Sequence, residues 1–84
     1  MKRICTSIGR KSVHDVLEQA KLVSSISDVI EVRLDMLEEI ELISLVESIQ
    51  TELLFTNRPI WEGGQWSGDE EKRVGFLLEA MRLG

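Results

Sequence analysis

Eighty-four residues allow one small domain at most, and a chain of this size buries only about 60–65% of its unfolded surface on folding. The composition, 43% hydrophobic and 30% charged, is that of an ordinary globular chain. A net charge of -5 argues against nucleic-acid and anionic membrane partners, and a single cysteine excludes an internal disulfide and a multi-cysteine metal site.

No apolar run approaches the roughly 18 residues of a membrane span. The N-terminal stretch MKRICTSIG is too short and too polar for a signal peptide. The expected location is therefore the cytoplasm.

The chain begins with a strand pattern followed by a helix pattern. Short apolar or β-branched runs predict strands, and the first covers Arg3 to Ile8. A helix is predicted over about Val13 to Val23, with Ser12 as its N-cap and Asp15 three residues further on. The residues expected to share its buried face are Val13, Leu17 and Ala20.

The same two patterns then repeat. A second strand is predicted from Val29 to Leu34 and a second helix from about Glu39 to Gln50. The apolar stripe expected along this helix consists of Ile43, Val46 and Ile49.

A third strand is predicted from Leu53 to Asn57, and a third helix follows after a loop. Ser67 and Glu70 have the spacing of a capping box, and Gly84 is the expected C′ residue. The predicted apolar stripe of this helix is Val74, Leu77, Leu78 and Met81.

The resulting order, βαβαβα, predicts an α/β fold in which the strands are parallel and joined by right-handed crossovers. The loop Arg58 to Trp66, RPIWEGGQW, follows the carboxyl end of the third strand. Folds of this class build their sites at that end of the sheet, which makes the loop a candidate site by analogy.

The second strand has an unusually charged face. Because side chains alternate, Glu31, Arg33 and Asp35 share one side of it. Burying unpaired charges is costly, so this face is either wet or lines a polar cavity. One interpretation is a half-exposed strand on which Glu31 and Arg33 simply pair with each other.

The neighbouring strands favour the polar cavity. Thr56 and Arg58 alternate in the same way on the third strand, and Cys5 and Ser7 do so on the first. These groups converge at one end of the sheet, as in the mouth of a (β/α) barrel that holds a polyhydroxylated or anionic small molecule. Arginine suits such a ligand because its guanidinium binds oxygens in pairs.

The stretches VIEVRLD, from Val29 to Asp35, and LFTNRPIWEGG, from Leu54 to Gly64, together resemble type I 3-dehydroquinate dehydratases. The resemblance continues through Asp69 to Arg73 and includes Ile4 to Ile8, so it covers essentially the whole chain in order.

The resemblance implies that residues 1–84 are the first three units of a TIM (β/α)8 barrel, an incomplete N-terminal part of that domain. It implies a lyase of the shikimate pathway of aromatic amino acid biosynthesis, which converts 3-dehydroquinate to 3-dehydroshikimate. The family uses a lysine Schiff base and a histidine as general acid and base, without a metal or organic cofactor.

The resemblance also implies a set of substrate-binding residues. Ser7 matches a pocket serine, Arg58 matches an arginine that binds substrate oxygens, and Glu62 matches a glutamate that pairs with arginine to order the site. Gly63 and Gly64 would let the loop turn close to the ligand. The full set is Ser7, Glu31, Val32, Arg33, Arg58 and Glu62.

Plainer interpretations apply to the same loop. Trp61 and Trp66 are expected to pack within the loop rather than contact a ligand. Arg58 and Glu62 would, in the plainer case, form a surface ion pair worth under about 1 kcal/mol.

The catalytic lysine and histidine of the family have no counterpart here. The only histidine, His14, is expected to be a solvated residue at a helix start, and the lysines lie at a terminus, in a loop or on helices. No histidine is placed to activate Cys5 as a nucleophile. The isolated chain is predicted to be inactive.

Two hypotheses follow. The chain is either the N-terminal piece of a dehydratase, which its end at an expected helix cap favours, or a self-standing, non-catalytic βαβαβα binding or assembly module. In the second case the exposed sheet face and edge would favour homo-oligomers.

Overall fold

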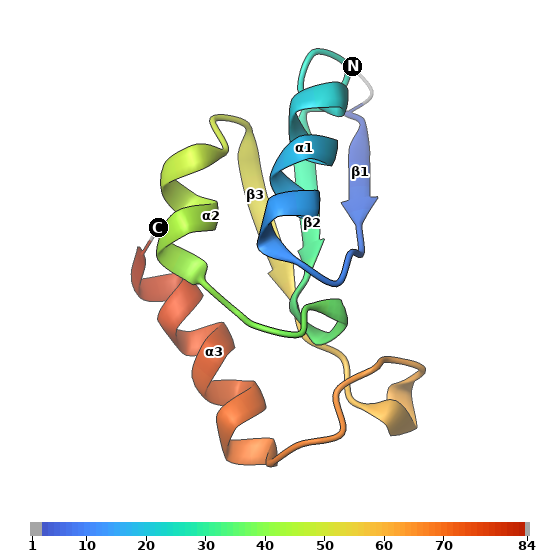
Figure 1. The fold of residues 1–84 in the computed structure, drawn as a ribbon, viewed down its shortest axis with the longest axis vertical. Helices are drawn as coiled ribbons and strands as arrows, with labels where there is room; N and C mark the ends of the chain where they lie inside the picture. Colours follow the sequence, from blue (N-terminus) through green and yellow to red (C-terminus); the bar gives the residue numbers. More distant parts are fainter. Residues whose placement is uncertain (1–2, 84) are drawn as a thin grey trace.

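A computed structural model describes residues 3–83 and shows strands alternating with helices (Figure 1). The predicted order βαβαβα is confirmed. The elements are β1 (Cys5–Ile8), α1 (Val13–Val23), β2 (Val29–Arg33), the short 3-10 helix η1 (Leu34–Met36), α2 (Leu42–Ser48), β3 (Glu52–Thr56), the 3-10 helix η2 (Ile60–Glu62) and α3 (Glu70–Leu83).

The three strands form one parallel sheet in the order β1-β2-β3. Each strand is joined to its neighbour by a helix, as the alternating pattern predicts. This arrangement is that of the first three units of a (β/α)8 barrel.

The sheet has one covered face and one uncovered face. In Figure 1, α1 and α2 lie over the same face of the sheet. The apolar side chains packed between these helices and the sheet form the core. The buried apolar core residues are Ile8, Val16, Ala20, Ile30, Val32, Leu34, Leu37, Leu42, Leu45, Ile49 and Ala80. We call the other face of the sheet the open face. Its residues are Cys5, Ser7, Val29, Glu31, Arg33, Glu52, Leu54 and Thr56.

Helix α1 has the predicted bounds and the predicted cap. The side chain of Ser12 accepts a hydrogen bond from the backbone N–H of Asp15, at 3.1 Å, and satisfies one of the free donors of the first turn. Val16 and Ala20 are buried on its inner face, and Val13 and Leu17 pack at the margin of the core.

Helix α2 is shorter than predicted, and its buried face agrees with the predicted stripe only at Ile49. The structure buries Leu42, Leu45 and Ile49, whereas Ile43 is 58% exposed. The segment LISLVESI carries apolar residues around most of the helix, so the spacing alone fits more than one stripe. Packing against the sheet selects the one that contains Leu45.

The predicted cap of α3 is also wrong. The helix begins at Glu70, and the carboxylate of Asp69, not the hydroxyl of Ser67, accepts a hydrogen bond from a first-turn amide, that of Glu71, at 2.9 Å. Glu70 pairs with Arg73 instead of reaching back. The expected C′ residue, Gly84, lies outside the described residues.

The predicted stripe of α3 is only partly buried. Ala80 is buried, and Phe76, Leu77 and Leu83 pack against the core. Most of the predicted stripe points outward, with exposures of 39% for Val74, 57% for Leu78 and 77% for Met81. The helix carries apolar residues on two faces, and only one of them meets α2 and β3.

Between residues 3 and 83, no helix combines the length and the apolar character that crossing a membrane requires.

Candidate functional site

The polar side chains of the open face line up across the strands. The register sets Ser7 of β1 beside Glu31 of β2, and Leu54 of β3 lies on the other side of Glu31. Arg33 is one alternation further toward the carboxyl end and lies beside Thr56. Ser7 is exposed and Glu31 is half-buried. The predicted convergence of polar groups on one face is therefore present in the sheet.

Val32 lies on the opposite face. Its register partners are Ile8 and Phe55, and its side chain is fully buried in the core beneath the helices. Strand alternation makes this unavoidable, because Val32 lies between Glu31 and Arg33. The side chain of Val32 therefore cannot reach the open face.

Arg33 pairs with Asp35, which replaces the Glu31–Arg33 pair of the plainer interpretation. The Nε of Arg33 donates to Oδ1 of Asp35 at 3.1 Å, and Nη2 donates to Oδ2 at 2.7 Å. Asp35 belongs to η1 and its side chain is fully buried, so it does not continue the open face as the alternation predicted. The chain leaves the extended conformation at Leu34, and the alternation ends there.

The buried carboxylate of Asp35 stays charged. Burial by itself would raise the pKa of Asp35, but hydrogen bonds from Arg33 and from the backbone amides of Gln65 and Arg58 hold it below its usual value. The hydrogen bond to Asp35 is the largest effect and raises the pKa of Arg33; burial opposes it, and the charges of Asp35 and Glu31 add smaller increases. Both groups are ionised over the whole physiological range.

The loop Arg58 to Trp66 is closed by its own main chain. The N–H of Trp66 donates to the carbonyl of Arg58 at 3.1 Å, and the N–H of Ile60 donates to the carbonyl of Trp66 at 3.2 Å. Within the loop, the N–H of Gly64 donates to the carbonyl of Pro59 at 2.9 Å. These main-chain hydrogen bonds fix the backbone of the loop, so Arg58 extends from an ordered segment and not from a flexible one.

The two glycines of the loop have separate roles. Gly63 has a φ of 83°, a left-handed conformation that other residues adopt at a cost. Gly64 is buried, and a Cβ atom there would collide with the main-chain carbonyl of Arg58. Gly64 thus allows the two sides of the loop to touch.

Arg58 and Glu62 both point to solvent, and the expected ion pair between them is not formed. Among residues 3–83, every ion pair within 4.0 Å involves other residues. Ile60 and Trp61, at 59% and 71% exposed, are also turned outward, so the expected packing of Trp61 in the loop is wrong. The guanidinium of Arg58 keeps its donors available for a ligand.

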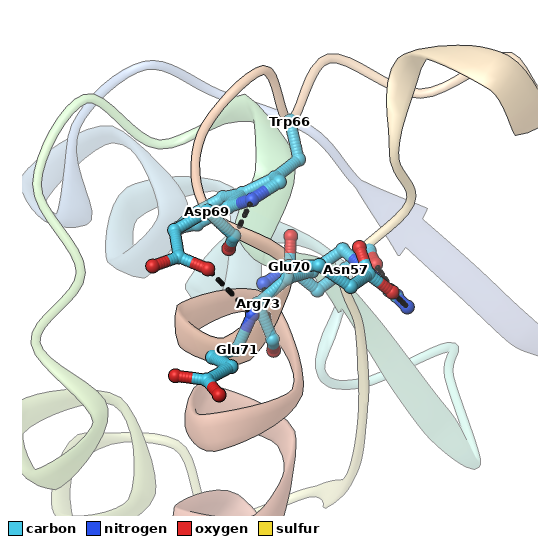
Figure 2. Close-up of polar contacts among 6 residues, drawn as sticks. All are labelled: Asn57, Trp66, Asp69, Glu70, Glu71 and Arg73. Atoms are coloured by element: carbon cyan, nitrogen blue, oxygen red, sulfur yellow. Dashed lines mark hydrogen bonds and ion pairs between the residues drawn. The ribbon is translucent and has the colours of Figure 1, made fainter.

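A second cluster fixes the loop to α3 (Figure 2). Nη1 of Arg73 donates to the carbonyl of Asn57 at 2.7 Å, and Nδ2 of Asn57 donates to the carbonyl of Arg73 at 3.4 Å. Glu70 holds the same guanidinium through Nε, at 2.9 Å, and through Nη2. This pairing lowers the pKa of Glu70 and raises that of Arg73. Asn57, one residue before Arg58, is 3% exposed.

Trp66 attaches the far end of the loop to the same helix. Its ring meets that of Phe76 edge to face, with centroids 5.9 Å apart and planes at 73°. Its Nε1 donates to the carbonyl of Asp69 at 3.2 Å (Figure 2). Trp66 therefore packs with the protein, as expected.

Two buried side-chain oxygens at the end of β3, Thr56 Oγ1 and Asn57 Oδ1, have no hydrogen-bond partner among the described residues. Thr56 lies beside Arg33 on the open face. A water molecule or a ligand hydroxyl could donate the missing hydrogen bond to each of these oxygens.

The sequence did not predict the contacts that Asp35 and Arg73 make. For Arg73 a signal existed, because a cation in the first turn of a helix is unfavourable for the helix dipole and requires an acceptor nearby. For Asp35 no local signal distinguishes a carboxylate that continues the strand from one that turns under the loop.

The described residues offer few other reactive groups. His14 is exposed on α1 and its Nε2 lies 3.2 Å from Oε1 of Glu18. With Asp15 these two side chains form a solvent-exposed trio whose ligand atoms lie within 4.8 Å of one another. Cys5 is exposed on the open face, and Lys72 is exposed on α3.

Comparison with known proteins adds the decisive observation. The family model described as Type I 3-dehydroquinase matches residues 4–84. The chain belongs to this family. The match covers all three strands, the charged stretch of β2 and the loop from Arg58 to Trp66, so the elements that build the open face lie within it.

Individual relatives agree. A 3-dehydroquinate dehydratase of Desulfotalea psychrophila is 46% identical over 83 residues, and one of Methanocaldococcus jannaschii is 31% identical over 78. These alignments cover 99% and 93% of this chain but only 36% of each relative. A chloroplastic bifunctional 3-dehydroquinate dehydratase/shikimate dehydrogenase of Arabidopsis thaliana is 37% identical over 86 residues, which are 14% of its length. The chain thus spans about a third of the single-function relatives.

Proposed function

We propose that residues 1–84 form the N-terminal part of a 3-dehydroquinate dehydratase barrel and carry part of its substrate site. The observation that supports this most is the open face, where Ser7, Glu31 and Arg33 share one side of neighbouring parallel strands, with Arg33 at the carboxyl end of β2 and the Arg58 loop following β3. The family membership and the names of the relatives favour 3-dehydroquinate as the ligand.

The four polar groups suit a hydroxylated carboxylate. Arg33 spends two of its five N–H donors on Asp35, which leaves three for oxygens of the substrate. Arg58 has an exposed guanidinium that can bind a carboxylate through two parallel hydrogen bonds. Glu31 can accept hydrogen bonds from hydroxyl groups, and Ser7 can donate or accept. Glu62, exposed on the same loop as Arg58, would add a further acceptor.

The reaction would proceed by elimination of water from a Schiff base between the substrate ketone and a lysine, with a histidine moving the proton. We assign neither role to a residue of this chain. Lys72 and His14 are exposed on helices rather than at the ends of strands. Both groups would come from later strands of the complete barrel, and no metal or organic cofactor would take part. The 84 residues alone would be inactive. The location we propose for the complete enzyme is the cytoplasm.

The first test is the intact mass of the protein that the cell makes. A complete barrel of about 250 residues would weigh roughly three times the 9.6 kDa of this chain. A mass of 9.6 kDa would instead favour the non-catalytic module, because the lysine and histidine of later strands would be missing. The sheet would then permanently expose Leu54 and its outer strand edges, which would favour assembly with other chains.

The second test traps the Schiff base. Borohydride added with 3-dehydroquinate should attach the reduced substrate to one lysine, and peptide mapping should locate it beyond Gly84. An adduct on Lys11, Lys21 or Lys72, or no adduct in a protein of full barrel mass, would contradict the proposal.

A further inference from the structure

The carboxylate of Asp35 joins two parts of the site that are far apart in the sequence. It accepts two hydrogen bonds from Arg33 at the end of β2, and its Oδ2 also accepts one from the backbone N–H of Gln65 at 2.9 Å. The amide of Arg58 lies close enough to stabilise the charged form. Asp35 therefore contacts both a strand end and the loop that presents Arg58.

We propose that Asp35 is a positioning residue that fixes the guanidinium of Arg33 and the Arg58 loop relative to each other. The ligand role of the two arginines rests on the proposed function. The positioning itself rests only on the contacts of the buried carboxylate.

The geometry explains why one carboxylate can do this. Binding Nε and Nη2 together fixes the plane of the Arg33 guanidinium, because a two-pronged contact permits one orientation. The Gln65 amide is held by the same group, and the main-chain bonds between Trp66 and Arg58 transmit that anchor to Arg58. Without Asp35 both arginines would have to be ordered by the ligand at the moment of binding, which weakens affinity.

A merely structural ion pair would behave differently. Its loss would destabilise the whole domain, and its effect on ligand affinity would be the same whether Arg58 is present or replaced. A positioning residue acts through the groups that it holds, so the part of its effect that passes through Arg58 should disappear once Arg58 has been removed.

The test uses the protein as its cell makes it, with Asp35→Asn as the main variant. Asparagine has nearly the same shape, but it lacks the charge and cannot satisfy all the donors. Glu52→Gln is the matched control, because Glu52 also pairs with an arginine, Arg3 at 2.9 Å, but is exposed at the opposite end of the sheet.

The first readout is amide hydrogen exchange. Asp35→Asn should speed the exchange of Gln65 and Trp66 by at least about tenfold, whereas the core of β2 and α1 should keep its protection. Glu52→Gln should leave the loop unchanged. Wild-type protection of Gln65 in Asp35→Asn, or an equal loss of protection throughout the domain, would overturn the proposal.

The second readout is the affinity for 3-dehydroquinate, taken from KM in a steady-state dehydration assay, because the active protein would consume the ligand in an equilibrium titration. Asp35→Asn should weaken binding about tenfold or more, since a small misplacement of positioning groups can cost on the order of a hundredfold. Added to Arg58→Ala, the same change should weaken binding clearly less than it does in the wild type, because only its effect through Arg33 remains. Losses that multiply independently would show that Asp35 does not act through Arg58.

The outcomes separate the two proposals. If the wild-type protein does not bind 3-dehydroquinate but Asp35→Asn still releases the loop selectively, the proposed function fails and the positioning of the arginines stands. If the wild type binds and Asp35→Asn leaves loop exchange and affinity unchanged, the positioning role fails and the proposed function stands.

A measurement on the wild type decides the matter if Asp35→Asn does not fold. The Nε–H of Arg33, bound to Asp35, should exchange at least about tenfold more slowly than the Nε–H of the exposed Arg58 in the absence of ligand. Equal rates would overturn the proposal, because Arg33 would then not be held.

Discussion

Replacing Gly64 with alanine tests how the Arg58 loop is built. Gly64 is buried, and its added Cβ would fall on the main-chain carbonyl of Arg58. The atom in the way belongs to the main chain and not to a flexible side chain, and the N–H of Trp66 holds it in place at 3.1 Å. The backbone on one side of the loop must shift, and this shift displaces Arg58.

The expected cost is the difference between two terms. Overpacking of this kind typically costs about 1–3 kcal/mol. Alanine restricts the unfolded chain more than glycine does, which returns about 0.4–1 kcal/mol. The free energy of unfolding should therefore fall by about 1–2 kcal/mol, a large share of the stability of so small a domain.

Two other glycines supply matched controls. Gly75 is an exposed residue inside α3 with open space at its Cβ position, so Gly75→Ala should stabilise by about 0.5–1 kcal/mol. Gly63 also has open space, but its φ of 83° should cost an alanine about 1–2 kcal/mol.

The assay is urea unfolding followed by far-ultraviolet circular dichroism, with the midpoint compared at constant slope. The reasoning about the loop would be refuted if Gly64→Ala unfolded at the wild-type midpoint or shifted it upward together with Gly75→Ala.

Further predictions concern the charges and the core. The pKa of Asp35 is depressed in the folded state, so the stabilisation by its charge is fully present above the unfolded-state pKa and is lost as the pH falls through the folded-state pKa. The difference in unfolding free energy between wild type and Asp35→Asn should therefore narrow in acid. A difference that is independent of pH would contradict the assignment. In the complete enzyme, Arg58→Ala should cost about 2–4 kcal/mol of transition-state binding, seen in kcat/KM, and an unchanged value would remove Arg58 from the site. Glu31→Gln should reduce turnover more than it lowers the melting temperature; a change in the melting temperature alone would make the charge structural. Leu45→Ala, at a fully buried position, should lower the free energy of unfolding by about 2–5 kcal/mol. Ile43→Ala, on the exposed side of the same helix, should lower it by under about 1 kcal/mol. Equal losses would favour the buried face that the spacing predicted.

The sequence alone was enough for the order of elements and for the bounds and cap of α1. Short β-branched runs and apolar spacing are local properties, and the cap of α1 depends on Ser12 and on an amide three residues away. Strand alternation also placed Glu31 and Arg33 on one face, because that relation needs only the backbone of β2. The family resemblance was equally readable, since it rests on two contiguous stretches.

Tertiary structure decided which faces of α2 and α3 are buried. Both helices carry apolar residues on more than one side, so their spacing admits several stripes, and contact with the sheet selects Leu45 and Ala80. It also decided the partners of the charges. Arg33 bonds to Asp35, and the carbonyl of Asn57 accepts from Arg73 sixteen positions away. Such pairs depend on where the chain turns in space, and residue type and spacing do not specify that.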